Sequence, residues 1–312
     1  MCETAIYLHL KESQSSDPYY ELFRLAIKHV SLLFLTCLVK RNPPTVWFYV
    51  PNIFIYHMNN PHTIKLLSAV FHSSTNSLPE AKEQLVCVLF VSAMCQDTKM
   101  LETVCTLHFD ISQTCKWDNH NVLSLTTCYG SLEIFRYLLD EKKMSHLFVH
   151  PQTRMNLLHM AVYFGNKPIL QEILARELFD IDSTLQDTST NALHLSVARP
   201  ASKVNSLEIF KMLQSKIPKA KATKVYSALN GNGDTLLLLA FKAKRTKLFK
   251  HLLSIPEIDP NQENIQGETI LIHAIRHKEL SFVKILLSNK RVSVKHFNKS
   301  KELLFFPLFF SI

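Results

Sequence analysis

Apolar residues recur in regularly spaced blocks along the second half of the chain. Each block opens with Asn or Thr, continues with a run of apolar residues that contains a Leu or Ile pair, and then has a small residue, as in "NLLHMAVYFG" and "NALHLSVA". The opening residues are Asn121, Asn156, Asn191, Thr235 and Thr269. They follow one another at steps of 35, 35, 44 and 34 residues. A nearly fixed period in this range predicts an array of structural repeats.

Each copy predicts two helices joined by a tight turn. The opening Asn or Thr is expected to be a helix N-cap, because its side chain accepts a hydrogen bond from the first turn. We expect close helix contact at the small residues Ala161, Ser196, Ala240 and Ala274. Gly130 and Gly165 stand where the chain must reverse, a place that favours the positive φ of glycine. A second apolar block, such as "LEIFRYLL" or "FVKILL", predicts the outer helix. The links "NGNGD" and "NIQGE" predict turns.

This pattern resembles the ankyrin repeat, with its T-P-L-H-x-A-A-x-x-G signature. His159 and His194 match the motif His, and Thr235 and Thr269 match its Thr. The turn positions fall on Gly130, Gly165, Gly233 and Gly267. The resemblance implies an all-α solenoid of five to six helix-turn-helix units, the sixth and least regular of which starts near Val88. It also implies that His159 and His194 are structural hydrogen-bonding residues.

The copies also depart from the ankyrin signature. None has the motif Pro, and Lys244 and Lys278 replace the turn Gly. The unit from Asn191 carries about nine extra residues, which we assign to "RPASKVN" and to the linker "SKIPKAKATKVYSA".

The predicted organisation has three parts. Residues 1–83 form an irregular, mostly helical N-terminal region that covers the first repeat, residues 84–300 form the array, and residues 301–312 form an apolar tail. The apolar run Val30–Val39 is too short to span a bilayer and is expected to be a buried helix. The tail, "LLFFPLFFSI", fits a docked segment, an insertion element or the end of a truncated product.

Composition narrows the class of protein further. Apolar residues make up 47% of the chain and charged residues 20%, which is typical of a folded core. The formal charge of +9 permits an acidic partner, nucleic acid or an anionic membrane surface and selects none of them. The seven cysteines form no C-x-x-C pair, so we expect free thiols in a reducing compartment. This places the protein in the cytoplasm, with the nucleus as an alternative.

No set of residues predicts catalysis or a cofactor. His273 and His277 share a helix face, but "HAIRH" lacks the Glu of a metalloprotease helix. His146 and His150 have the same spacing in a linker next to Pro151. Packed or solvated histidines are the preferred interpretation, with no metal site. "NGNGD" is not followed by the Lys-Ser/Thr of a phosphate loop. The protein is therefore not expected to be an enzyme.

One basic run remains to be interpreted. Lys216, Lys219, Lys221 and Lys224 could serve nuclear import or bind nucleic acid, or could belong to a solvated loop. Aromatic residues do not alternate with these lysines, so we favour the loop.

The ankyrin resemblance implies a non-enzymatic module that binds a partner protein in its concave groove. Irregular repeats with an expanded middle linker also resemble inhibitors of NF-κB, and a substrate adaptor of a ubiquitin ligase is the alternative. Carried over from the family, the partner-binding residues are Trp117, Asp118, Cys128, Tyr129, Tyr163, Phe164, Arg199, Lys242, Arg276 and His277. They predict an extended partner segment that is apolar at one end and acidic at the other.

Overall fold

The structure is a computed structural model that describes residues 89, 92–93, 96, 98–105, 110–114, 119–185, 188–199 and 206–294. The chain divides into two compact units, residues 1–148 and residues 149–312. The described residues are helical, and their only β-structure is two isolated bridges, Val149 to Asn156 and Thr184 to Asn191. The predicted N-terminal region 1–83, the run Val30–Val39 and the tail 301–312 lie outside the described residues.

The described helices of the first unit are short. They are α7 (Thr98–Cys105), α8 (Val122–Tyr129) and α9 (Leu132–Arg136), and α9 runs directly into a π-helical turn, η2 (Tyr137–Glu141). The block "LEIFRYLL" therefore forms an outer helix, as predicted, but its second half is wound more widely than an α-helix.

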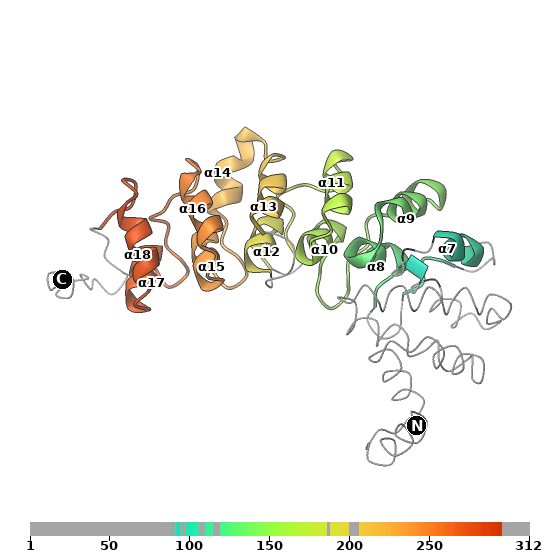
Figure 1. The fold of residues 1–312 in the computed structure, drawn as a ribbon, viewed down its shortest axis with the longest axis horizontal. Helices are drawn as coiled ribbons and strands as arrows, with labels where there is room; N and C mark the ends of the chain where they lie inside the picture. The colour runs from blue at the N-terminus through green and yellow to red at the C-terminus, as the bar shows by residue number, and fades with distance from the viewer. Residues whose placement is uncertain are drawn as a thin grey trace, which may run out of the picture. The chain divides into compact units, whose positions relative to one another are not determined.

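The second unit is built from helix pairs (Figure 1). The pairs are α10 (Leu157–Phe164) with α11 (Lys167–Ala175), α12 (Ala192–Ala198) with α13 (Ser206–Gln214), α15 (Leu236–Lys242) with α16 (Thr246–Ser254), and α17 (Ile270–Arg276) with α18 (Leu280–Leu287). The first helix of each pair contacts the first helix of the next pair, so α10, α12, α15 and α17 form one row. We call these the inner helices and their partners the outer helices.

The predicted helix starts are confirmed. At each of the five positions the Asn or Thr side chain accepts a hydrogen bond from the backbone N–H three residues further on. This bond satisfies one of the donors that a helix start leaves without an intrahelical partner. The small residues are also placed as expected, with no exposed surface at Ala161, Ser196, Ala240 and Ala274.

The turns between paired helices confirm one expectation and correct another. Gly165 ends α10 with a φ of 76°. Lys244 and Lys278 stand at the equivalent places with φ of 53° and 57°, so lysine does adopt the left-handed conformation there. Gly130, however, has an extended φ of −82°, and the expected positive φ is wrong. Glycine is needed there for space, because an added Cβ would lie 2.6 Å from Cγ2 of Thr126.

The linker in the expanded repeat is not a loop. Residues Lys219–Ser227 form helix α14, which buries Ala222, Val225 and Tyr226. The three apolar residues have i, i+3, i+4 spacing and give the helix a single buried face. Lys221 pairs with Asp182 at 3.0 Å and with Asp180 at 3.6 Å, so this lysine is partly compensated by the preceding hairpin.

Candidate partner-binding face

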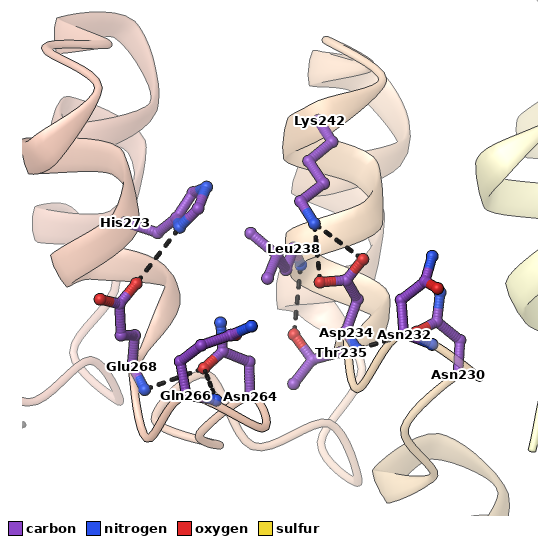
Figure 2. Close-up of polar contacts among 10 residues, drawn as sticks. All are labelled: Asn230, Asn232, Asp234, Thr235, Leu238, Lys242, Asn264, Gln266, Glu268 and His273. Carbon is purple, nitrogen blue, oxygen red and sulfur yellow. Dashed lines mark hydrogen bonds and ion pairs between the residues drawn. The ribbon is translucent and has the colours of Figure 1, made fainter. Parts of the chain in front are cut away.

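Two hairpin loops of the second unit share one geometry. In the loop 230–234, the side-chain oxygen of Asn230 accepts from the backbone N–H groups two and four residues further on, at 2.9 and 2.8 Å. In the loop 264–268, Asn264 makes the same two bonds at 2.9 and 3.0 Å. Figure 2 shows the two loops side by side. The turns predicted from "NGNGD" and "NIQGE" are thus confirmed, and in each turn one asparagine side chain bonds two backbone N–H groups.

Each of these loops is tied to its inner helix by an ion pair. The buried carboxylate of Asp234 accepts from Nζ of Lys242 at 2.7 and 2.8 Å (Figure 2). One repeat later, Glu268 pairs with Arg276. In both cases the acidic residue lies just before the N-cap, and the basic residue lies eight positions further on. The positive charge expected at this end of the surface is therefore largely compensated.

Sequence reasoning missed Asp234 and Glu268, although a signal was present. "DTLLLLAFK" and "ETILIHAIR" place an acid and a base at the same two positions of consecutive repeats. An inner helix of this length spans roughly 10 Å, and long Lys and Arg side chains reach back along it. An acidic residue followed eight positions later by a basic residue, in two consecutive repeats, is the signal that could have identified Asp234 and Glu268.

The end of the last inner helix carries a cluster of rings. His273 and His277 have ring centroids 4.4 Å apart, and the ring of Phe241 meets His273 edge-on at 5.4 Å. Burial is the main cause that lowers the pKa of His273, and its neighbours His277 and Lys242 act in the same direction. The carboxylate of Glu268, 3.5 Å from its Nδ1, opposes them. Among the residues that the structure describes, no group of three His, Cys, Asp or Glu side chains could hold a metal ion.

The aromatic residues expected in the groove form a pair. Tyr163 and Phe164 lie at the end of α10, both half-buried, with centroids 5.3 Å apart in an edge-on arrangement. Counted from the N-caps, Tyr163, Lys242 and Arg276 occupy the same position of their inner helices. We call the loops 230–234 and 264–268, together with Tyr163, Phe164, Lys242, Arg276 and His277, the hairpin face.

Two of the residues predicted to bind a partner are buried within this chain. Cys128 is 4% exposed and Arg199 is 2% exposed. Nε of Arg199 donates to the backbone carbonyl of Tyr163 at 3.2 Å, and its guanidinium lies against Gly165. Arg199 thus links α12 to the turn after α10. Trp117 and Asp118 lie outside the described residues, and Tyr129, which is half-buried, belongs to the first unit.

His159 and His194 have the structural role that the sequence indicated. Each Nδ1 accepts from the backbone N–H of its own N-cap residue, at 3.4 and 3.2 Å. Each Nε2 bonds to a carbonyl oxygen in the following repeat, at 3.1 Å from Ser183 and 3.0 Å from Ala228. These partners fix a neutral imidazole, and burial lowers the pKa of His159 to about 4.

Stacked helix pairs joined by hairpin loops define a helical repeat protein. Residues 193–298 match the family model of ankyrin repeats, in three copies. This part of the chain is therefore similar to ankyrin repeats, which are in general protein–protein interaction modules.

Comparison with whole proteins finds 88 similar chains among solved structures. A solved structure of an ankyrin repeat protein from Leishmania major is similar, with 15% sequence identity over 71% of this chain and 76% of that chain and a TM-score of 0.43. No curated protein matches the sequence. In the described part of the chain, no helix is both long and apolar enough to cross a membrane.

Proposed function

We propose that the second unit binds a partner protein through its hairpin face. The observation that carries this proposal is the placement of Tyr163, Lys242 and Arg276 at the same position of three of the four inner helices, α10, α15 and α17. Aromatic and Arg side chains are common anchors of protein interfaces. Lys242 is paired with an acid of the loop 230–234, and Arg276 is paired with an acid of the loop 264–268. This pairing lowers the cost of ordering the two side chains when the partner binds.

The ion pairs decide which partner groups fit at the basic end. Lys242 and Arg276 are already bonded to Asp234 and Glu268, so a partner carboxylate has to share them. Arg276 has further N–H donors on its guanidinium, and an acceptor on the partner can use these. We infer an extended segment with apolar side chains against Tyr163 and Phe164 and with hydrogen-bond acceptors or carboxylates toward Arg276.

Partner identification tests the proposal. The full chain is purified from cells with its bound proteins, and Rel-type factors would indicate an inhibitor of the NF-κB type, whereas ligase subunits would indicate an adaptor. Separating nuclei from cytoplasm before the purification shows in which of the two compartments the protein and its partner are found.

Two variants then locate the surface. Tyr163→Ala should weaken binding by about 1 to 2 kcal/mol, mainly through faster release. Arg276→Glu should slow association and reduce its dependence on salt. Leu287→Ala and Lys216→Glu change an exposed apolar residue and an exposed lysine outside the hairpin face and serve as matched controls. If Tyr163→Ala and Arg276→Glu bind like the controls, the partner uses another surface.

A further inference from the structure

A second surface lies on the outer helices, away from the hairpin loops. Helices α16 and α18 border a depression of about 590 Å³. Lys250 lines it from α16, Lys284 lines it from α18, and Lys290 lines it from the turn after α18. All three side chains are exposed, and no Asp or Glu contributes to the lining. We call this depression the lysine groove.

The lysines of this groove differ from many others in the second unit. Lys167, Lys221 and Lys242 each form an ion pair with a carboxylate. Lys250, Lys284 and Lys290 form none with the residues that the structure describes. The first acidic residue after α16 in the sequence is Glu257, whose charge adds to burial in raising the pKa of Tyr226 in helix α14. Three positive charges therefore share one groove without compensation.

Both ends of the lysine groove are held in place. At one end, Nζ of Lys244 lies 3.3 Å from the carboxylate of Glu279, which joins the turn before α16 to the start of α18. At the other end, the guanidinium of Arg291 donates to backbone carbonyls at the end of α16 and in the loop that follows, including Ile255 at 3.1 Å and Ile258 at 2.9 Å. Lys290 is thus presented by an anchored turn, so an occupant does not have to order it.

The floor and the hydroxyl groups define the chemistry that fits. Leu253 and Ile285 supply an apolar floor. The hydroxyls of Ser254 and Ser288 donate to carbonyls of their own helices at 2.7 Å, so the ammonium groups are the free donors. No aromatic residue lines the groove, which removes the stacking surface that single-stranded nucleic acid uses.

We propose that the lysine groove binds an acidic peptide segment of a partner protein, with Asp or Glu side chains at Lys250, Lys284 and Lys290 and an aliphatic side chain on the floor. Charge complementarity steers such a segment toward the groove and fixes its register. The site is separate from the hairpin face, so the protein could hold two segments at the same time.

A peptide titration of the full chain tests this proposal. The probe is a short fluorescein-labelled peptide of Glu and Asp residues around a central Leu, and its binding is followed by fluorescence anisotropy. The double variant Lys250→Glu and Lys284→Glu should lose about tenfold or more in affinity. The control Lys216→Glu and Lys219→Glu makes the same change in net charge at exposed lysines outside the groove and should bind like the parent. Higher salt should weaken binding to the parent chain.

Several outcomes would overturn the proposal. The proposal is wrong if the peptide does not bind the parent chain at millimolar concentration, or if the two double variants bind the peptide equally well. Duplex DNA or vesicles with anionic lipids that bind more tightly than the peptide, and that also depend on Lys250 and Lys284, would assign the groove to another occupant. The milder pair Lys250→Gln and Lys284→Gln, checked by thermal melting, guards against loss of the fold. Tyr163→Ala should leave peptide binding unchanged, so the two surfaces can fail independently.

Discussion

The middle repeats and the last repeats of the second unit use different residues to cap the inner helix and to join one repeat to the next. In the middle repeats, the N-caps are Asn156 and Asn191. The histidine three residues later accepts a hydrogen bond from the backbone N–H of the N-cap, and its Nε2 bonds to a backbone carbonyl of the next repeat. In the last repeats the caps are Thr235 and Thr269, and the position of the histidine holds Leu238 or Ile272.

The last repeats replace the histidine link with other contacts. Phe282 meets Phe241 and Phe249 edge-on at centroid distances of 5.0 and 4.9 Å, which joins α18 to the preceding helix pair. Ion pairs then tie each loop to its own inner helix. The middle repeats are therefore joined by buried histidine bonds that depend on pH, and the last repeats by apolar contacts together with polar contacts of Lys244 and Arg291. The comparison shows that one helix-pair geometry accepts either kind of link.

The largest expected effect should be common to both regions. Leu193 in α12 and Leu237 in α15 follow their N-caps by two residues, and both are buried. Leu193→Asp should cost about 3 to 5 kcal/mol, because it leaves an unpaired charge between stacked helices. Leu237→Asp should cost a similar amount, as measured by urea unfolding. Ala198→Asp, at the exposed end of α12, is the control. An unchanged urea midpoint for Leu193→Asp would show that α12 is not stacked as described.

Acid should weaken the middle repeats through their two buried histidines. Burial holds the pKa of His159 at about 4 in the folded state, against 6.5 for the ordinary side chain, and it also lowers the pKa of His194. The unfolded chain therefore binds protons first as pH falls, and stability that is complete above pH ~6.5 is lost below it. For His159 alone, the loss between pH ~7 and pH ~5 should be about 2 kcal/mol.

Urea unfolding at these two pH values measures the effect. His159→Leu should lower stability at neutral pH, because the carbonyl of Ser183 loses its partner, and it should flatten the pH dependence. His146→Leu changes a half-buried histidine of the first unit and provides the control. A parent chain and a His159→Leu variant with the same pH dependence would contradict the neutral, buried imidazole.

Substitutions in the turns after the inner helices should change the stability of the fold in opposite directions in the two regions. Gly165→Ala should cost about 1 kcal/mol, since its φ is positive and the new Cβ would approach the guanidinium of Arg199. Lys244→Gly should instead stabilise the fold by up to about 1 kcal/mol, because glycine adopts a positive φ without strain. Loss of the ion pair with Glu279 should offset part of this gain. Thermal melting of both variants, with Lys247→Gly in α16 as a destabilising reference, checks the signs. Equal effects of the two turn substitutions would show that the turns are not equivalent.

The sequence predicted the parts of the fold that follow from local rules. Asn156 and Thr235 could be identified as N-caps, because capping chemistry depends on one side chain and the turn that follows it. The register placed Lys244 at the turn position that Gly165 occupies, whereas its positive φ came from the structure. Three features could not be predicted in this way. The need for glycine at position 130 is set by the space beside Thr126, the helix α14 by only three buried side chains, and the burial of Arg199 by its bond to the turn after α10.

The candidate site was predicted less completely for the same reason. Residues of the hairpin face were located from repeat register, yet whether each is exposed or compensated depends on neighbours that register does not reveal. Asp234 neutralises Lys242, and this pair converts an expected basic surface into a nearly neutral one.

The smallest expected effect concerns this ion pair, which the middle repeats lack. Asp234 has a side chain that is 5% exposed, whereas that of Lys242 is 48% exposed, so water screens the attraction from one side. Lys242→Met should cost only about 0.5 kcal/mol. Asp234→Asn should cost more, about 1 kcal/mol, because the amide cannot accept from Lys242 with both atoms and leaves a polar group buried. A double-mutant cycle with both changes isolates the pair, whose coupling energy should be about 0.5 kcal/mol and should shrink at high salt. A coupling energy near zero at low salt would mean that Asp234 contributes to the loop 230–234 and not to an attraction with Lys242. The hairpin face would then present Lys242 as an uncompensated charge, and the acidic partner segment expected from the sequence would be the better fit.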